Sequence, residues 1–268
     1  MTKIATQAVR AGIDCDTAFG AVTPPIVLSS NFTFEEFGKK RVYDYSRSGN
    51  PTRDQLATAI SSLEGGAGGI ITSTGMSAIA LVLQALAIPG DRVLVPHDCY
   101  GGSWRLFKAL SGKGAFELEV VDFTNSDALR DALTRKPALV WLETPSNPLL
   151  RITDIRNVAK AAKAVGALVV ADNTFLSPAL QRPIEHGADI VVHSTTKFIN
   201  GHSDVVGGAV VAADSVVLEQ LRWWGNALGL VGAPFDSFLT LRGLRTLDAR
   251  LRVHQENTAR VAEILRQH

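Results

Sequence analysis

Cysteine is scarce in this chain, and neither sign of charge is in excess. The 268 residues contain only two cysteines, Cys15 and Cys99. Two scattered thiols are too few for a disulfide framework or a structural zinc site, so both are expected to be reduced. The 27 Lys and Arg nearly balance the 26 Asp and Glu, which leaves a net charge of +1. This balance argues against nucleic acids and membrane surfaces as partners.

Long hydrophobic runs are also missing. No apolar stretch reaches the length of a membrane span, and residues 1–10 are polar and mixed, unlike a signal peptide. A soluble, cytoplasmic protein is therefore expected. The glycine-rich segment 64–69 precedes a strand instead of following one and opening a helix, so the fingerprint of a nicotinamide-dependent oxidoreductase is not found. With 46% hydrophobic residues, the chain can form one large core or two modest ones.

From residue 64 onward, short apolar runs alternate with segments of helical periodicity. This alternation predicts an α/β fold, with a mostly parallel central sheet between two layers of helices. In 153–165, for example, the apolar residues fall on one helical stripe, and Gly166 supplies the stop. The expected strands are 69–72, 92–96, 116–122, 138–143, 167–172, 189–193 and 207–213, and the expected helices are 52–63, 76–87, 102–110, 126–134 with Ser126 as its N-cap, 153–165 and 236–268.

The two ends of the chain differ from this middle part. The segments 23–25 and 43–52 break regular structure, so residues 1–60 are expected to form an extended arm and a loop. Residues 61–240 are expected to form the large domain. Residues 241–268 are strongly helical and stop in mid-helix. They are expected to start a helix that leads to a C-terminal domain absent from this sequence.

Polar residues cluster where the predicted strands end, and ligands of parallel sheets bind at that edge. Asp172 and Lys197 follow two of these strands. A lone lysine would mean little, because most lysines are solvated surface groups. An amine and a carboxylate presented together are what pyridoxal phosphate (PLP) requires. The lysine can form a Schiff base with the cofactor aldehyde, and the aspartate can hold the pyridine nitrogen protonated so that the ring accepts electrons.

The segment Ser73-Thr-Gly-Met-Ser77 opens a helix directly after a strand. The backbone amides of Gly75 and Met76 would point at an anion there, for which a phosphate is the natural candidate. Ser194 and Thr196 could add hydroxyl donors from the loop that carries the lysine. Taken alone, the segment is more often an ordinary capped helix start.

Three other groups of residues suggest chemistry but favour simpler roles. Cys99 follows a histidine and an aspartate, yet adjacent residues point different ways, so ordinary packing is favoured over a nucleophile. His193 and His202 flank Lys197 without a carboxylate or cysteine at a ligand-like spacing, so no metal site is expected. Trp223 and Trp224 are expected in a subunit interface.

Six segments in order, spread from residue 45 to residue 202, resemble the PLP enzymes of cysteine and methionine metabolism. This is the transsulfuration group of fold type I, which contains synthases, lyases and sulfhydrylases. Similarity extends through nearly the whole chain. Within the group, the bacterial synthases that form cystathionine are most similar, on the basis of residues 97–107, Leu180 and residues 223–224. The six segments are Tyr45-Ser-Arg-Ser-Gly-Asn-Pro-Thr52, Thr74-Gly-Met-Ser-Ala78, Tyr100-Gly-Gly102, Glu143-Thr-Pro-Ser-Asn-Pro148, Asp172-Asn-Thr174 and Ser194-Thr-Thr-Lys-Phe-Ile-Asn-Gly-His202.

The resemblance implies a role for each of several residues. Lys197 would bind the cofactor and then move protons between the substrate carbons and the cofactor. Asp172 would pair with the pyridine nitrogen, and Tyr100 would stack on the ring. Tyr45 and Arg47 would reach the cofactor phosphate of a neighbouring subunit, where a guanidinium suits phosphate oxygens. Catalytic roles are expected for Lys197, Tyr100 and Tyr45; phosphate contacts for Gly75, Met76, Ser194 and Thr196; and substrate contacts for Arg105, Asn147 and Asn226.

The implied reaction is γ-replacement on an O-acylhomoserine, with O-succinylhomoserine expected, by L-cysteine. The products would be L-cystathionine and succinate, in methionine biosynthesis by transsulfuration. A cystathionine or methionine γ-lyase and an O-acylhomoserine sulfhydrylase stay open as alternatives. Ser48 stands where the bacterial synthases tend to have a second basic residue, which leaves the acyl preference open.

The resemblance also concerns assembly. Shared active sites require at least a dimer, and a homotetramer built of such dimers is expected. Members of the family have an arginine in a C-terminal domain that binds the substrate α-carboxylate, and no counterpart is identified here. A catalytically silent fragment is therefore a remote alternative.

Overall fold

One seven-stranded sheet organises the computed structural model, which describes residues 3–268. Its strand order is β1-β7-β6-β5-β4-β2-β3, and β7 runs antiparallel to both of its neighbours while the remaining pairs are parallel. This mixed but mostly parallel sheet confirms the predicted fold class. The strands are β1 Gly68–Thr72, β2 Arg92–Pro96, β3 Glu117–Val121, β4 Leu139–Glu143, β5 Leu168–Asp172, β6 Ile190–Ser194 and β7 Gly208–Ala212.

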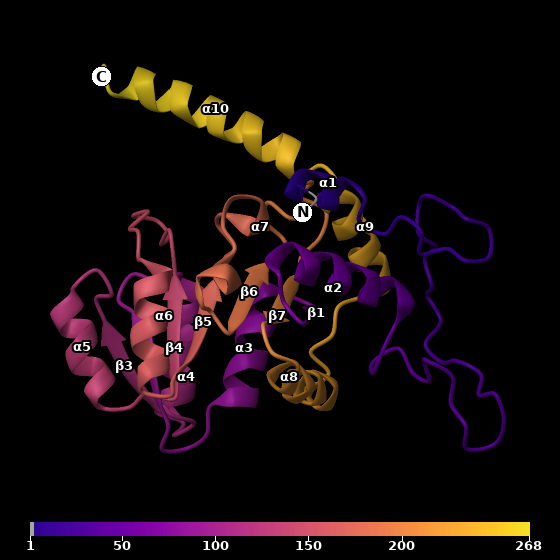
Figure 1. Cartoon of the computed structure of the whole chain (residues 1–268), viewed down its shortest axis with the longest axis horizontal. Coiled ribbons are helices and arrows are strands. Elements are labelled where there is room, and N and C mark those ends of the chain that lie inside the picture. Colours follow the sequence, from indigo (N-terminus) through magenta and orange to yellow (C-terminus); the bar gives the residue numbers. More distant parts are fainter. Residues whose placement is uncertain (1–2) are drawn as a thin grey trace.

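Helices cover both faces of the sheet (Figure 1). Buried residues of α3, α4 and α8 form one core with the strands. In this core the Phe107 and Trp141 rings pack edge to face, with their centroids 5.2 Å apart. On the other face, α5 and α6 cover one part of the sheet and α2 and α9 cover another. These helices are α2 Pro51–Glu64, α3 Gly75–Leu86, α4 Gly101–Gly112, α5 Ser126–Thr134, α6 Ile155–Ala164, α8 Ser215–Leu228 and α9 Pro234–Leu244.

Helix caps follow the expected chemistry, with one difference in position. The side chain of Asn125, and not Ser126, accepts the N–H groups of Asp127 and Ala128 at the start of α5. The prediction of Ser126 as N-cap was wrong by one residue, because an asparagine caps at least as well as a serine and stands just before it.

The N-terminal segment contains a short helix, α1 (Ile4–Val9), and then runs as a long irregular trace to α2. Figure 1 shows this trace leaving the body of the molecule in two excursions. Asn50 ends it by accepting the N–H groups of Thr52 and Arg53, and Pro51 occupies the first helical position. Helix α1 was not expected within this arm.

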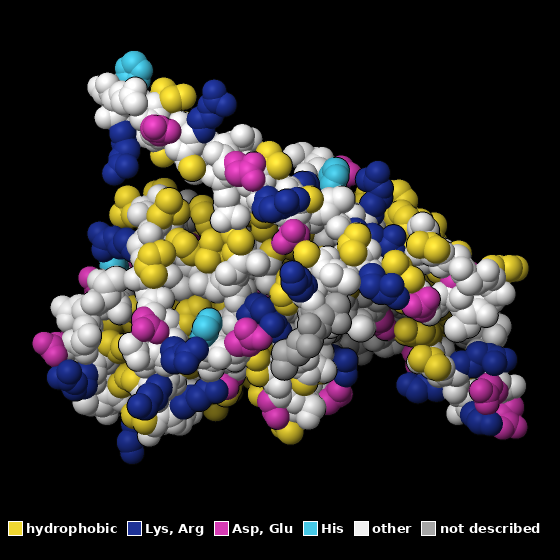
Figure 2. Space-filling model, turned by 45° about the horizontal axis from the view of Figure 1, so that its top comes forward, with side chains coloured by type: hydrophobic (Ala, Val, Ile, Leu, Met, Phe, Trp, Pro, Cys, Tyr) yellow, Lys and Arg dark blue, Asp and Glu magenta, His cyan; other side chains and the backbone are white. Residues whose placement is uncertain are grey.

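The C-terminal segment forms two helices where one was expected. Helix α9 ends at Leu244, and α10 (Leu247–Leu265) begins after a short break. Only the start of α10 is buried, and the rest stands out from the body with both charged and hydrophobic side chains on its surface (Figure 2). The remaining short elements are α7 (Ser177–Leu180) and the 3₁₀ helix Pro183–His186. Within residues 3–268, no helix is long and apolar enough to span a bilayer.

Candidate active site

A cavity of about 660 Å³ opens at the carboxyl ends of β4, β5 and β6, beside the first turn of α3. The topology explains this position, because parallel strands end at one edge of the sheet and their polar terminal residues meet there. Most of the residues expected to bind a cofactor line this one cavity. They are Gly75, Met76, Tyr100, Asp172, Ser194, Thr196 and Lys197, and Asn147 from the expected substrate contacts lines it as well.

Asp172 is the last residue of β5, and the residue is partly exposed at the cavity while its carboxyl group is desolvated. Its Oδ1 atom accepts the N–H of Thr174 at 3.0 Å. Burial raises the pKa of Asp172, whereas the hydrogen bonds from Thr174 and the charge of His193 act in the opposite direction. A desolvated carboxylate of this kind is stabilised by a cationic N–H donor entering from the cavity.

Lys197 lies in the loop after β6, and its side chain is exposed within the cavity. The Ser194 N–H donates to Thr174 Oγ1 at 2.8 Å, which ties this loop to the loop that follows Asp172. Beyond the lysine, Arg250 of α10 donates to the carbonyl oxygens of Phe198 at 2.7 Å and Ile199 at 3.3 Å. The lysine is therefore presented from a segment that is fixed on both sides.

The first turn of α3 approaches this lysine loop closely. Thr74 caps the helix by accepting the Ser77 N–H at 2.9 Å, so the amides of Gly75 and Met76 precede the first intrahelical hydrogen bond. A Cβ atom on Gly75 would lie 2.7 Å from Ser194 Cβ, so only glycine allows this approach. The capped helix start therefore coincides with the position expected for an anion site. Thr196 Oγ1 exchanges hydrogen bonds with the backbone of Gly207 (N at 3.0 Å, O at 3.2 Å).

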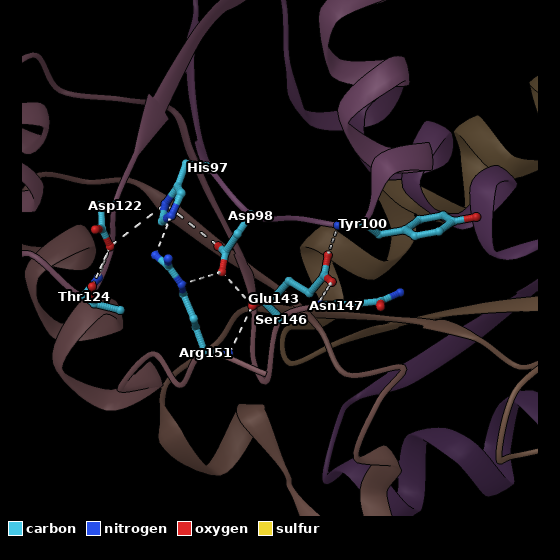
Figure 3. A network of polar contacts seen from close by, with 9 residues as sticks. All are labelled: His97, Asp98, Tyr100, Asp122, Thr124, Glu143, Ser146, Asn147 and Arg151. Atoms are coloured by element: carbon cyan, nitrogen blue, oxygen red, sulfur yellow. Dashed lines mark hydrogen bonds and ion pairs between the residues drawn. The ribbon is translucent and has the colours of Figure 1, made fainter. Parts of the chain in front are cut away.

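Tyr100 stands before α4 and is tied to the end of β4 by Glu143 (Figure 3). Glu143 Oε2 accepts the Tyr100 N–H at 2.7 Å, and Oε1 accepts the Asn147 N–H at 3.2 Å. Burial, followed by the charge of Asp172, raises the pKa of Glu143 to about 7. Glu143 lines the cavity and was not among the predicted site residues. Its position at a strand exit within the Glu143–Pro148 motif was the available signal.

A second polar network lies beside Glu143 (Figure 3). Asp98 accepts the Ser146 hydroxyl at 2.6 Å, and Arg151 donates to His97 Nε2 at 2.8 Å. Cys99, which follows Asp98 in the sequence, is partly buried, and burial together with the charge of Glu143 raises the pKa of its thiol to about 12. The thiol is therefore protonated at neutral pH, which supports packing over nucleophilic chemistry.

A fully buried group supports the sheet beneath the cavity. Glu64 Oε1, at the end of α2, accepts from His193 Nε2 at 2.7 Å and from Asn173 Nδ2 at 2.8 Å. Asn173 adjoins Asp172, and His193 adjoins Ser194, so the carboxylate links the ends of β5 and β6. This pairing was not predicted, because 129 residues separate Glu64 from His193. Among residues 3–268, no group of three His, Cys, Asp or Glu side chains could hold a metal ion.

Four of the predicted site residues do not line this cavity of the single chain. Tyr45 and Arg47 lie on the N-terminal trace. The Arg47 guanidinium is 5.6 Å from the centroid of the Tyr45 ring. Arg47 Nη1 also donates to the Asn226 carbonyl oxygen at 2.8 Å. Asn226 and Arg47 face a different hollow beside α2 and α8. Arg105 is exposed on α4. The predicted roles of these four residues stay predictions.

The donor set at the cavity fits PLP. Asp172 offers a desolvated carboxylate for a pyridinium N–H, and Lys197 offers an amine for the aldehyde. The start of α3, with its glycine held against Ser194, forms an anion cradle that a Cβ atom would fill. The pyridine nitrogen, the aldehyde and the phosphate of the cofactor thus each have a chemically matched group in the same cavity.

Comparison with known proteins gives consistent matches over the whole chain. The family model described as "Cys/Met metabolism PLP-dependent enzyme" matches residues 5–268. Cystathionine gamma-synthase of Escherichia coli K12 is 53% identical over 98% of this chain and 68% of its own length. A cystathionine beta-lyase of Coxiella burnetii is 45% identical over 100% of this chain and 69% of its own length.

Solved structures give the same result. Cystathionine gamma-synthase from Xanthomonas oryzae pv. oryzae, in complexes with aminoacrylate and cysteine and with cystathionine, is 69% identical with a TM-score of 0.98. These matches cover all of this chain and 69% of that one. A cystathionine gamma-lyase from Lactobacillus plantarum complexed with L-serine is 39% identical, with a TM-score of 0.96, over all of this chain and 70% of that one.

Proposed function

Because the chain belongs to the family of Cys/Met metabolism PLP-dependent enzymes, we propose that its activity is that of a cystathionine gamma-synthase. The reaction is γ-replacement on an O-acylhomoserine, with O-succinylhomoserine as the proposed substrate, by L-cysteine. The C–O bond at the γ carbon breaks and a C–S bond forms, so the products are L-cystathionine and succinate. The observation that carries this proposal is the opening of Lys197, Asp172 and the α3 N-terminus into one cavity.

Different residues of the cavity would bind the cofactor and transfer protons. Bound PLP supplies an electron-accepting ring, which makes the α proton of an attached amino acid acidic. Asp172 would hold the ring nitrogen protonated, the start of α3 with Ser194 and Thr196 would hold the phosphate, and the Tyr100 ring would pack on the pyridine face. Lys197 Nζ would hold the aldehyde carbon and, once displaced by substrate, carry protons between the substrate carbons.

A neighbouring subunit completes the proposed site. Tyr45 and Arg47 lie on the N-terminal trace, away from the cavity of their own chain, and both are exposed. We infer that residues 1–60 reach the phosphate site of an adjacent copy, and that the oligomer is a tetramer of site-sharing dimers. The large domain would span 61–240. Arg105, Asn226 and Asn147 are proposed substrate contacts, and a cytoplasmic location in methionine biosynthesis is proposed.

The proposed function is tested by product identification. The purified protein should show a visible absorption band that borohydride removes, with the pyridoxyl group on Lys197 by peptide mass mapping. O-succinyl-, O-acetyl- and O-phosphohomoserine are supplied with and without cysteine or sulfide. Cystathionine formed only with cysteine is the expected result. Homocysteine from sulfide would indicate a sulfhydrylase, and breakdown of cystathionine alone would indicate a lyase; either outcome would contradict the proposal. Lys197→Ala should abolish turnover in every case.

A further inference from the structure

Glu143 is a buried carboxylate whose two oxygen atoms serve two different loops. Only 8% of the residue is exposed. Oε2 accepts the N–H of Tyr100, which follows β2, and Oε1 accepts the N–H of Asn147, which follows β4 (Figure 3). The ionised form of Glu143 prevails above its pKa of about 7, and hydrogen bonds to this charged acceptor are shorter and stronger than those between neutral groups. Glu143 is therefore a tie between the two loops at the cavity wall.

Both residues held in this way line the proposed cofactor cavity. Tyr100 stands directly before α4, so the position of its backbone determines where its aromatic ring enters the cavity. Gly102 lacks the Cβ atom that would collide with the Tyr100 ring, and the ring thus lies against the start of the helix. Because the main chain of Tyr100 is anchored by Glu143, the place of its ring in the cavity depends on that carboxylate.

A second tie joins the same two loops from outside the cavity. Asp98 accepts the Ser146 hydroxyl at 2.6 Å, and Ser146 Oγ accepts the Arg151 N–H at 3.2 Å (Figure 3). Asp98 is two residues from Tyr100, and Ser146 is next to Asn147. The two loops therefore form one unit, of which Glu143 is the cavity-side connection.

The location of Glu143 is electrostatically unfavourable for a carboxylate. A specific role for the carboxylate would explain why a neutral side chain does not stand there. In the register of β4 and β5, Glu143 is paired directly with Asp172. A second carboxyl beside the one that pairs with the cofactor adds repulsion and desolvation, and a neutral side chain would avoid both. Two backbone N–H groups at this point need an acceptor with two oxygens, and a carboxylate provides it.

We propose that Glu143 is a positioning residue that holds the Tyr100 ring and the Asn147 side chain in place against the cofactor. This inference rests on the proposed function, because the ring has a task only when PLP is bound. Glu143 acts through Tyr100 and Asn147, and both of its oxygens are already engaged by backbone N–H groups. No proton transfer to substrate is assigned to it.

Glu143→Gln is the direct test. The glutamine keeps the shape and one acceptor, but its NH₂ group faces the second N–H, so one of the two ties is lost. The apoprotein is titrated with PLP, and the visible circular dichroism of the bound cofactor is recorded, since this signal reports the asymmetric surroundings of the ring. We expect PLP binding to weaken about tenfold, as for the loss of one hydrogen bond to a charged group. The dichroism should change as well.

A double-mutant cycle separates positioning from general stability. In a Tyr100→Ala background the ring is gone, so Glu143→Gln should weaken PLP binding by only about twofold. Asp98→Asn, which loosens the outer tie, should shift the dichroism in the same direction but less. Glu117→Gln, an exposed carboxylate at the start of β3, is the matched control and should leave PLP binding unchanged.

The outcomes distinguish this inference from the proposed function. If Glu143→Gln lowers only the melting temperature, with PLP affinity and dichroism unchanged, Glu143 is merely structural and the inference is wrong. An equal effect in the Tyr100→Ala background would also overturn it. Should Glu143→Gln fail to fold, Glu143→Asp keeps the charge but is too short to reach both N–H groups, and the same readouts apply. A wild-type protein without a borohydride-sensitive visible band would instead refute the proposed function itself.

Discussion

Two buried carboxylates, Glu143 and Glu64, show how single residues fix the geometry of the cavity. Glu143 accepts backbone N–H groups from two loops, and Glu64 accepts side-chain N–H groups at the ends of two strands. Both are buried, but their surroundings differ. Glu143 lies beside another carboxyl, whereas Glu64 lies beside a histidine. Different consequences follow for pH dependence and for stability.

The raised pKa of Glu143 predicts a loss of stability of the apoprotein as pH rises. The pKa of Glu143 is about 7 in the folded state and 4.5 in the unfolded chain, so the folded state binds the proton more tightly. The corresponding stabilisation is fully present below pH 4.5 and is lost as pH rises through 7, by on the order of 3 kcal/mol. Urea unfolding of the wild type and Glu143→Gln between pH 4.5 and 8 measures it. The wild type should lose stability relative to the variant across this window, and parallel curves would contradict the prediction.

Removal of the Glu64 carboxylate should destabilise the fold strongly. Glu64→Ala leaves the donors of His193 and Asn173 buried without their acceptor, which typically costs about 3–5 kcal/mol for a broken buried pair. The exposed pair of Arg222 and Glu219 on α8 provides the contrast, and Arg222→Ala should cost less than about 1 kcal/mol. Urea unfolding at pH 7 measures both, and similar losses for the two variants would contradict this account.

Site residues could be predicted from the sequence where the residue type itself has the required chemistry, such as an amine, a carboxylate or an aromatic ring. Lys197, Asp172 and Tyr100 were expected together, and the structure places all three in one cavity. Glu143 and Glu64 were not expected, because each depends on N–H groups that come close only when the loops and strands pack. The strand exit and the Glu143–Pro148 motif marked Glu143 as a candidate but did not reveal its two N–H partners, and no local pattern distinguishes Glu64 from a solvated carboxylate.

At the scale of elements, the seven predicted strands agree with the observed ones to within one residue at every end. Most of the strands contain a short apolar run with polar residues at or just beyond its end, whereas the edge strand β3 alternates Glu117 and Glu119 with apolar residues. Both patterns depend only on the chain itself.

Helix ends were less predictable. Residues 236–268 contain no proline, and Gly243 and Thr246 at the break before α10 were not recognised as the end of one helix and the start of the next. Helix α8 was absent from the expected helices. Yet α8 has recognisable ends, because the Asp214 side chain caps its start and Gly229 in the left-handed conformation ends it. This helix could have been predicted from the sequence.

Because α3 approaches the lysine loop closely at Gly75, we expect the added methyl group of Gly75→Ala to weaken PLP binding. Gly75→Ala would place Cβ 2.7 Å from Ser194 Cβ and 3.0 Å from Ser194 Oγ, so either the helix start or the loop must shift. We expect PLP to bind about tenfold more weakly, since the phosphate contacts come from these two segments. Titration of the apoprotein with PLP measures the change.

Gly112→Ala is the control for this prediction. No atom lies within 4 Å of a Cβ at Gly112, which ends α4. The substitution should leave PLP affinity unchanged and could only stabilise the helix slightly. If Gly75→Ala binds PLP as tightly as Gly112→Ala, the close approach does not form the phosphate site.

At the scale of the whole molecule, the position of the N-terminal trace separates Tyr45 and Arg47 from the cavity that they are proposed to complete. The trace extends from the body of the molecule, and its residues are mostly exposed (Figure 1). A segment with little burial in its own chain is consistent with contacts to another copy. Sequence alone could suggest this arrangement only through the family resemblance, because the single chain contains no partner surface that a local pattern would reveal.

Shared active sites predict that two defective variants restore each other. Lys197→Ala disables the cavity of its own chain, and Arg47→Ala disables the site of its neighbour. In a mixed dimer, the Lys197→Ala chain donates an intact Arg47 to the chain that still has Lys197, so one of the two sites is complete. Random pairing of equal amounts should therefore recover about a quarter of wild-type activity. Coexpression with different affinity tags isolates the mixed species, and light scattering gives its mass. Activity no higher than that of the separate variants would show that each site uses its own arm, and a monomeric mass would exclude sharing altogether.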